Sequence, residues 1–168
     1  RAANKNEKDL EEVVFEGYGP HGIAVVVETA TDNNTRTVAN IRMHFNRGNG
    51  ALGKTGSLDF IFDRKGIFTI EKGKFSLDEL ELELIDFGAE EVTEEEDGIY
   101  VITSFTDFGK MQKGMEEKGI TIISAELDRI PTNYTALTPE QQKEVHSLIE
   151  RLEDDDDVQN VFHNMKED

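Results

Sequence analysis

Eight consecutive residues, GNGALGKT from Gly48 to Thr55, satisfy the pattern GxxxxGK[ST] of phosphate-binding loops. In such a loop, successive backbone amides surround a phosphate and the lysine contacts its oxygens. The loop follows a strand and opens a helix, so that amides at the helix N-terminus point at the anion. Here a predicted helix precedes the motif and a predicted strand follows it. We therefore expect a helix C-cap followed by a flexible loop, rather than a nucleotide site.

The same region holds a local excess of positive charge. Between Asp32 and Lys54, one acidic residue is opposed by four basic residues, Arg36, Arg42, Arg47 and Lys54. The whole chain has a formal net charge of -18, so an anionic partner would have to dock at this segment. The four basic side chains are candidate contacts to nucleic-acid phosphates. The alternative interpretation is an ordinary solvated helix face.

Other residue types that could do chemistry form no recognisable site. The four histidines lack the spacing of metal ligands, and the chain contains no cysteine. The stretch from Ser76 to Asp97 holds eleven Asp or Glu residues and no Lys or Arg, and an unbroken aspartate run extends from Asp154 to Asp157. Such runs are usually solvated faces. Alternatively, they repel non-specific nucleic acid or contact a basic protein. We expect no catalytic residue, metal site or cofactor, and hence a protein that is not an enzyme.

Length and composition limit the classes of protein that remain. A chain of 168 residues allows one large domain or two small ones, and 36% hydrophobic residues with ten phenylalanines indicate a folded core. No apolar run approaches the roughly 20 residues of a membrane span. We therefore expect a cytoplasmic protein without membrane contact. The net charge opposes autonomous binding to nucleic acid, because most of the surface repels phosphates.

The elements that must position these residues follow from hydrophobic periodicity and turn signals. In the first half, strands are expected at 13–18 and 23–30, separated by a glycine-rich turn. A helix is expected from the caps at 32–34 to Gly48, because Val38, Ile41 and Phe45 share one face. Alternating apolar residues then predict a hairpin with strands at 58–63 and 67–70.

Capping signals dominate the second half. Ser76 and Thr138 each begin a capping box, and each precedes a periodic apolar stripe that is typical of an amphipathic helix. A further helix is expected at 106–118, where glycine ends the pattern. The expected strands are 92–95 and 99–103, paired as a hairpin, followed by 120–130 and 158–163.

This order of elements predicts an α+β protein with two ferredoxin-like (βαββαβ) α/β sandwich domains, one inserted in the other. Residues 1–10 are expected to be a linker. The first domain is assigned to 11–72 and 134–168, and the inserted domain to 73–133. The nested arrangement is favoured because the hairpin at 92–103 must lie in one sheet. Two tandem domains divided near Asp97 are the alternative.

Several separated motifs resemble those of one protein family. The stretch EGYGPHGIAVVVETATDNNTRTVANIRMHFNRGNGALGKTGS, from Glu16 to Ser57, is similar to the second-domain signature of the YebC/PmpR family. Members of that family contain closely similar EGYGPxG, TDNxxRT and GxLGxxGS elements. LDRIPTNY (127–134) and LEDDDDVQNVFHN (152–164) resemble the family's closing segments. Members begin with a basic helical domain that opens on a GHSKW-type motif, and this chain has no Trp. We therefore expect a fragment that lacks the N-terminal helical domain.

The resemblance implies two small α/β domains and a role in regulating gene expression. The family is described as transcriptional regulators that bind DNA and, in related bacterial and mitochondrial members, as factors acting on translation at the ribosome. The expected partner is DNA, or the ribosome and its RNA, contacted by the full-length protein including its N-terminal domain. A small-molecule-binding regulatory module and an NTP-binding enzyme are the alternatives from other classes. No feature of the sequence indicates an oligomeric state.

Overall fold

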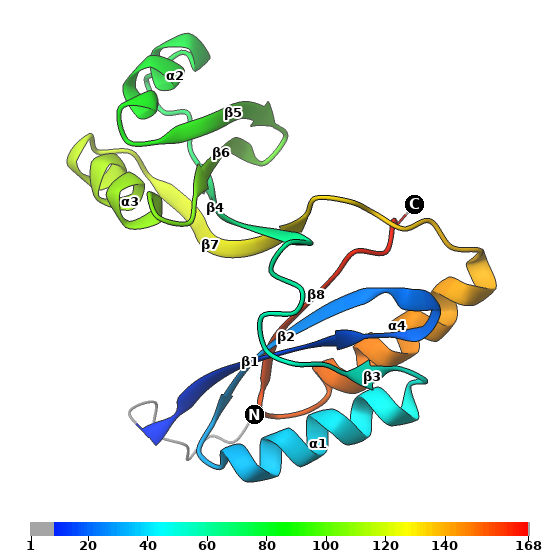
Figure 1. Cartoon of the computed structure of the whole chain (residues 1–168). Helices are drawn as coiled ribbons and strands as arrows, with labels where there is room; N and C mark the ends of the chain where they lie inside the picture. The colour runs from blue at the N-terminus through cyan, green and yellow to red at the C-terminus, as the bar shows by residue number, and fades with distance from the viewer. Residues whose placement is uncertain (1–8, 168) are drawn as a thin grey trace. The chain divides into compact units, whose positions relative to one another are not determined.

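The computed structural model describes residues 9–167 and divides them into two compact units (Figure 1). Unit 1 consists of the residues up to Phe62 together with those from Pro131 onward, and unit 2 is Asp63–Ile130. Each unit contains one four-stranded sheet and two α-helices. The predicted α+β fold class is therefore confirmed. No helix among the described residues is long and apolar enough to cross a membrane.

Unit 1 has an antiparallel sheet with the strand order β3-β1-β2-β8. The strands β1 and β2 pair without interruption from Glu11 opposite Thr31 to Tyr18 opposite Ala24. The element order is ββαβαβ instead of the predicted βαββαβ, because β1 pairs directly with β2, and the last helix and strand are separated from the rest by unit 2. The elements are β1 (Glu11–Tyr18), a 3-10 turn (Pro20–Gly22), β2 (Ala24–Thr31), α1 (Asn34–Arg47), β3 (Ala51–Leu52), α4 (Pro139–Glu153) and β8 (Val158–His163).

Both faces of the unit 1 sheet are covered. The helices α1 and α4 pack on one face, where Val25, Phe45 and Leu148 belong to one buried apolar cluster. On the other face, Leu58 and Phe62 pack against β2. The segment that connects β3 to unit 2 is therefore part of the unit 1 core.

Unit 2 has the ferredoxin-like element order βαββαβ and the strand order β5-β6-β4-β7. Its core lies between the sheet and the two helices, and the ring of Phe68 stacks on Phe108 with centroids 4.9 Å apart. The predicted capping box at Ser76 forms, and its hydroxyl accepts a hydrogen bond from Glu79 N. The elements are β4 (Phe62–Ile70), α2 (Leu77–Ile85), β5 (Ala89–Glu95), β6 (Gly98–Ser104), α3 (Phe108–Glu117) and β7 (Ile122–Pro131).

The predicted hairpin at 58–70 is wrong. Residues 55–61 form turns, and 62–70 form the single strand β4, which pairs with β6 instead of folding back on itself. The domain boundary consequently lies at 62/63, not at 72/73, and the return to unit 1 lies at 130/131, not at 133/134. A tandem division near Asp97 does not occur, because β5 and β6 flank this position and pair in one sheet. Most of the predicted 1–10 linker lies outside the described residues.

Candidate nucleic-acid interface

The helix α1 carries three of the four predicted cationic residues. Its N-cap is Asn33, whose side-chain oxygen accepts a hydrogen bond from Arg36 N at 3.1 Å. The helix ends at Gly48, as the sequence predicts, and Arg47 lies in the last turn, where the helix dipole favours a cation. The buried face of the helix consists of Thr37, Ile41 and Phe45.

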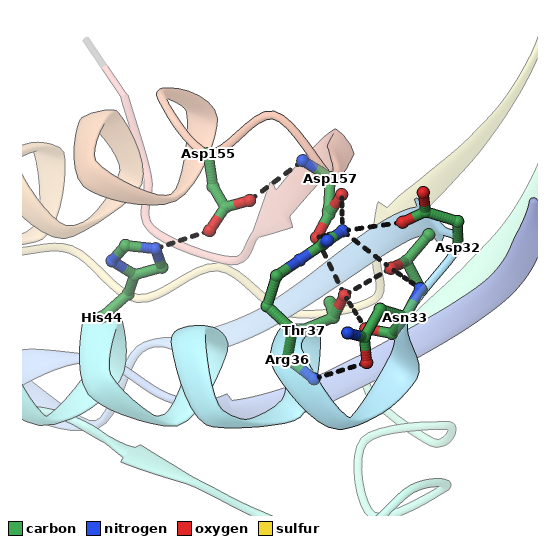
Figure 2. Close-up of polar contacts among 8 residues, drawn as sticks. Asp32, Asn33, Arg36, Thr37, His44, Asp155 and Asp157 are labelled. Atoms are coloured by element: carbon green, nitrogen blue, oxygen red, sulfur yellow. Dashed lines mark hydrogen bonds and ion pairs between the residues drawn. The ribbon is translucent and has the colours of Figure 1, made fainter. Parts of the chain in front are cut away.

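Arg36 is held by two carboxylates of its own chain (Figure 2). Its Nη2 atom lies 3.1 Å from each carboxylate oxygen of Asp157 and 3.0 Å from Asp32 Oδ1. Hydrogen bonds to Asp157, and secondly to Asp32, raise the pKa of Arg36. The Asp157 side chain is only 3% exposed, and a buried carboxylate requires such partners. Arg36 therefore ties the start of α1 to the start of β8.

A buried hydroxyl completes this network. Thr37 Oγ1 lies 2.8 Å from Asp157 Oδ2 and 2.7 Å from Thr31 Oγ1. Thr31 Oγ1 also accepts a hydrogen bond from Asn33 N at 2.9 Å. The end of β2, the first turn of α1 and the start of β8 are thus joined by one set of hydrogen bonds, shown in Figure 2. Such a fully connected network fixes the direction in which α1 leaves the sheet.

The sequence predicts a solvated face for the aspartate run after α4, and this prediction is wrong for part of the run. Asp155 Oδ2 lies 2.8 Å from His44 Nε2, and these side chains are only 10% and 12% exposed. Asp155 Oδ1 also accepts a hydrogen bond from Asp157 N at 2.9 Å. Two of the four aspartates therefore face α1, whereas Asp154 and Asp156 are exposed.

The other three predicted cations lie on the surface. Arg42 and Arg47 are exposed on α1, and Lys54 is exposed on the segment after β3, which runs beside α1 (Figure 1). Among residues 9–167, no ion pair joins any of the three to a carboxylate. Helix residues turn by about 100° each, so Arg42 lies about 120° to 140° around α1 from both Arg36 and Arg47. The cations therefore do not form a single row.

The phosphate-loop motif follows α1, as the sequence predicts, and residues 51–52 within it form β3. Two amides that follow it are already used by the chain: Gly56 N and Leu58 N donate to the Glu16 carboxylate at 2.5 and 2.8 Å. Glu16 is only 5% exposed, and its carbonyl oxygen accepts from Gly53 N. These amides, next to the motif, are therefore not available to a bound anion.

Comparison with known proteins identifies the family. The family model described as TACO1/YebC second and third domain matches residues 10–165. The chain belongs to the TACO1/YebC family. It is 60% identical to a probable transcriptional regulatory protein of Cytophaga hutchinsonii, over 99% of this chain and 70% of the relative. A protein of Parabacteroides distasonis with the same description is 54% identical over 100% of this chain and 70% of its own length.

A solved structure is similar in fold as well as in sequence. The crystal structure of a conserved hypothetical protein from Aquifex aeolicus has a TM-score of 0.75 and 31% identity to this TACO1/YebC chain. The similarity covers 98% of this chain and 68% of the Aquifex aeolicus chain. Both units of the present structure therefore belong to a fold that has been observed crystallographically.

In this TACO1/YebC chain, the two glycine-rich motifs meet in space. Gly17 and Tyr18 of EGYGPHG pair with Leu52 and Ala51, which makes β3 an edge strand. A Cβ atom at Gly50 would lie 2.3 Å from the carbonyl oxygen of Tyr18. The glycines allow the two backbones to approach each other. Lys54 and the exposed Tyr18 are consequently carried by neighbouring segments.

The histidines are engaged within the chain, a feature that their sequence positions do not reveal. Burial lowers the pKa of His163, which lies in β8. Among the described residues, no group of three or more His, Asp or Glu could hold a metal ion. Every histidine contacts a carboxylate, in the pairs His21–Glu144, His44–Asp155, His146–Glu167 and His163–Glu167.

Replacing Lys54 with alanine tests the phosphate-loop motif. We expect the melting temperature to change little, since the side chain is exposed and exposed substitutions usually alter stability by less than about 0.5 kcal/mol. We also expect no loss of nucleotide hydrolysis, because wild-type protein should have none. Turnover is measured with ATP and GTP for both proteins. Hydrolysis by wild type that disappears in Lys54→Ala would restore the phosphate-loop interpretation.

Proposed function

We propose that this chain is part of a non-enzymatic regulator of gene expression that contacts nucleic acid through Arg42, Arg47 and Lys54. The observation that carries the proposal is the division among the cations. Arg36 is bound to two carboxylates, whereas the other three are exposed and, in the part of the chain that the structure describes, have no carboxylate partner. Exposed cations of this kind are the groups that contact phosphates. The relatives' description as probable transcriptional regulatory proteins supports the same role.

The net charge determines how this contact would work. At -18 the chain as a whole repels nucleic acid, so three cations can give only weak binding by themselves. We propose that the full-length protein adds contacts through the N-terminal domain implied by the family resemblance. Unit 1 would then orient a nucleic acid that is held mainly elsewhere. The target is DNA, or the RNA of the ribosome.

The proposal that the protein is not an enzyme rests on polar groups that already bind other groups of the chain. The Glu16 carboxylate takes up amides beside the phosphate-loop motif. His44, which has the chemistry of a general base, is largely buried against Asp155. These groups stabilise the fold of unit 1.

A triple variant tests the proposed interface. Arg42→Gln, Arg47→Gln and Lys54→Gln together should reduce affinity for nucleic acid while leaving the melting temperature nearly unchanged. Each lost phosphate contact should lower the magnitude of the log-affinity against log-salt slope by about 0.7 for single strands or about 0.9 for duplex DNA. Fluorescence anisotropy with labelled single-stranded RNA and duplex DNA, at several salt concentrations, measures this slope. Both the 168-residue chain and the full-length protein should be compared.

The matched control removes the same charge from unit 2. Lys74→Gln, Lys110→Gln and Lys113→Gln alter three exposed lysines outside the proposed interface. We expect the slope of this variant to stay close to that of wild type. Equal effects of the two triple variants would show that only overall charge matters, and an unchanged slope in the first variant would refute the proposed interface.

A further inference from the structure

The helix α2 of unit 2 exposes a pair of large apolar side chains. Leu82 is 74% exposed and Ile85 is 63% exposed, although the helix buries Leu80 and Leu84 on its opposite side. Residues three apart in a helix are neighbours on its surface, so Leu82 and Ile85 form one patch. We call these two side chains the α2 patch. Two adjacent apolar side chains at this exposure are more than the isolated surface leucine that needs no explanation.

Carboxylates surround the α2 patch. The surface neighbours of a helical residue lie three and four positions away. For Leu82 and Ile85, the polar neighbours at these distances are Asp78, Glu79, Glu81 and Asp86, and all four are exposed. The helix itself contains no Lys or Arg. Along α2, the patch is thus an apolar centre whose charged neighbours, its rim, are all negative.

The charges on α2 are poorly balanced within the chain. Asp86 is the C-cap, where the helix dipole disfavours an anion, and no basic residue lies in the last turn. Asp78 and Glu79, by contrast, lie in the first turn, where the dipole favours anions, and Glu79 accepts a hydrogen bond from Ser76 N. Of the acidic residues on this helix, Glu83 alone forms an ion pair within the described chain, with Lys118. A cationic partner would therefore offset the unfavourable negative charge at the C-terminal end of α2.

We propose that the α2 patch is a docking surface for a protein segment that presents apolar side chains flanked by Lys or Arg. Charge complementarity selects this occupant. Unit 2 contains eighteen Asp or Glu residues against eight Lys or Arg, so it carries a net charge of -10 and repels nucleic acid and anionic lipid. A second copy of the chain would bring the same carboxylates together. Of these partners, only a segment with both cationic and apolar side chains can pair with the carboxylates of the rim and also cover Leu82 and Ile85.

A designed peptide tests this inference. The probe is a Leu/Lys peptide of about 14 residues, or roughly four helical turns, with all leucines on one face. A second peptide has the same composition but a scrambled order, so that it keeps the charge and loses the apolar face. We expect wild type to bind the amphipathic peptide about tenfold more tightly than the scrambled one. The double variant Leu82→Gln/Ile85→Gln should lose this preference, as measured by fluorescence anisotropy.

Two further variants make the result specific to α2. Ile123→Gln/Leu127→Gln removes another pair of exposed apolar side chains from unit 2 and should keep the full preference. Glu81→Lys/Asp86→Lys reverses the rim charge and should weaken binding of both peptides by at least about tenfold. Amide hydrogen exchange checks that α2 remains folded in each variant.

Three results would overturn the proposal. The first is an equal preference in wild type and in Leu82→Gln/Ile85→Gln. The second is self-association of wild type in sedimentation equilibrium that this double variant abolishes, which would make a second copy the occupant. The third is binding of wild type, but not of the double variant, to vesicles of phosphatidylglycerol, which would make the patch a membrane contact.

Discussion

Replacing Asp157 with alanine is expected to destabilise unit 1 by about 1.5–3 kcal/mol, the range for hydrogen bonds to a charged group. The carboxylate is almost completely buried and contacts both Arg36 and the hydroxyl of Thr37. Its loss removes the contacts that join α1 to the start of β8. Amide hydrogen exchange of peptides from α1 and β8 measures the local free energy of opening, and peptides from unit 2 should keep their protection.

Asp154→Ala is the matched control for this prediction. Asp154 belongs to the same aspartate run but is exposed at the C-cap of α4, where a carboxylate is unfavourable to the helix dipole. We expect its replacement to change stability by less than about 0.5 kcal/mol. If Asp157→Ala were as mild as Asp154→Ala, the network of Figure 2 would contribute nothing measurable to unit 1.

The elements that sequence analysis predicts well are those with local signals at their ends. The capping boxes at Ser76 and Thr138 form as predicted, because each depends on residues only three positions apart. The caps of α1 and the hairpin between β5 and β6 are also confirmed. In each case, the interacting residues are close enough in sequence for their pattern to be recognised.

The incorrect hairpin at 58–70 shows where local patterns fail. Gly66 suggests a turn, yet it lies inside β4. A Cβ atom there would be 2.5 Å from the ring of Phe108 and 2.6 Å from Thr103 Oγ1, so glycine is needed for packing and not for a turn. Leu58 is buried in unit 1, on the face of the unit 1 sheet that α1 and α4 do not cover. Both facts depend on residues distant in sequence.

The sequence predicts which residues belong to the candidate site, but not how they are arranged. The sequence indicates Arg36, Arg42, Arg47 and Lys54 as a cationic group, and the position of Arg36 four residues after Asp32 is the local signal that separates it from the others. Its buried partner Asp157 lies 121 positions away along the chain and has no such local signal. An aspartate run that is solvated and one that pairs with a helix have the same amino-acid sequence. Only the fold shows that Asp157 faces α1 and that Arg36 is already engaged.

Gly50→Ala is expected to have the second large effect, a loss of about 3 kcal/mol, at the upper end of the usual cost of overpacking. The new Cβ atom would lie 2.3 Å from the carbonyl oxygen of Tyr18 and 3.0 Å from Gly19 Cα. These are backbone atoms, so no side-chain rotation can relieve the contact. The pairing of β3 with β1 should therefore be lost, which urea unfolding and amide exchange of β1 would detect.

Gly109→Ala provides the control, because nothing lies within 4 Å of a Cβ atom at this position in α3. Alanine there should stabilise the helix by about 0.5–1 kcal/mol, since glycine loses more conformational entropy on folding. Gly50→Ala should also weaken nucleic-acid binding as much as Lys54→Gln does, because β3 positions the segment that carries Lys54. Normal stability together with normal binding in Gly50→Ala would show that the close approach of the two glycine motifs is not required, whereas lost stability with normal binding would remove Lys54 from the proposed interface.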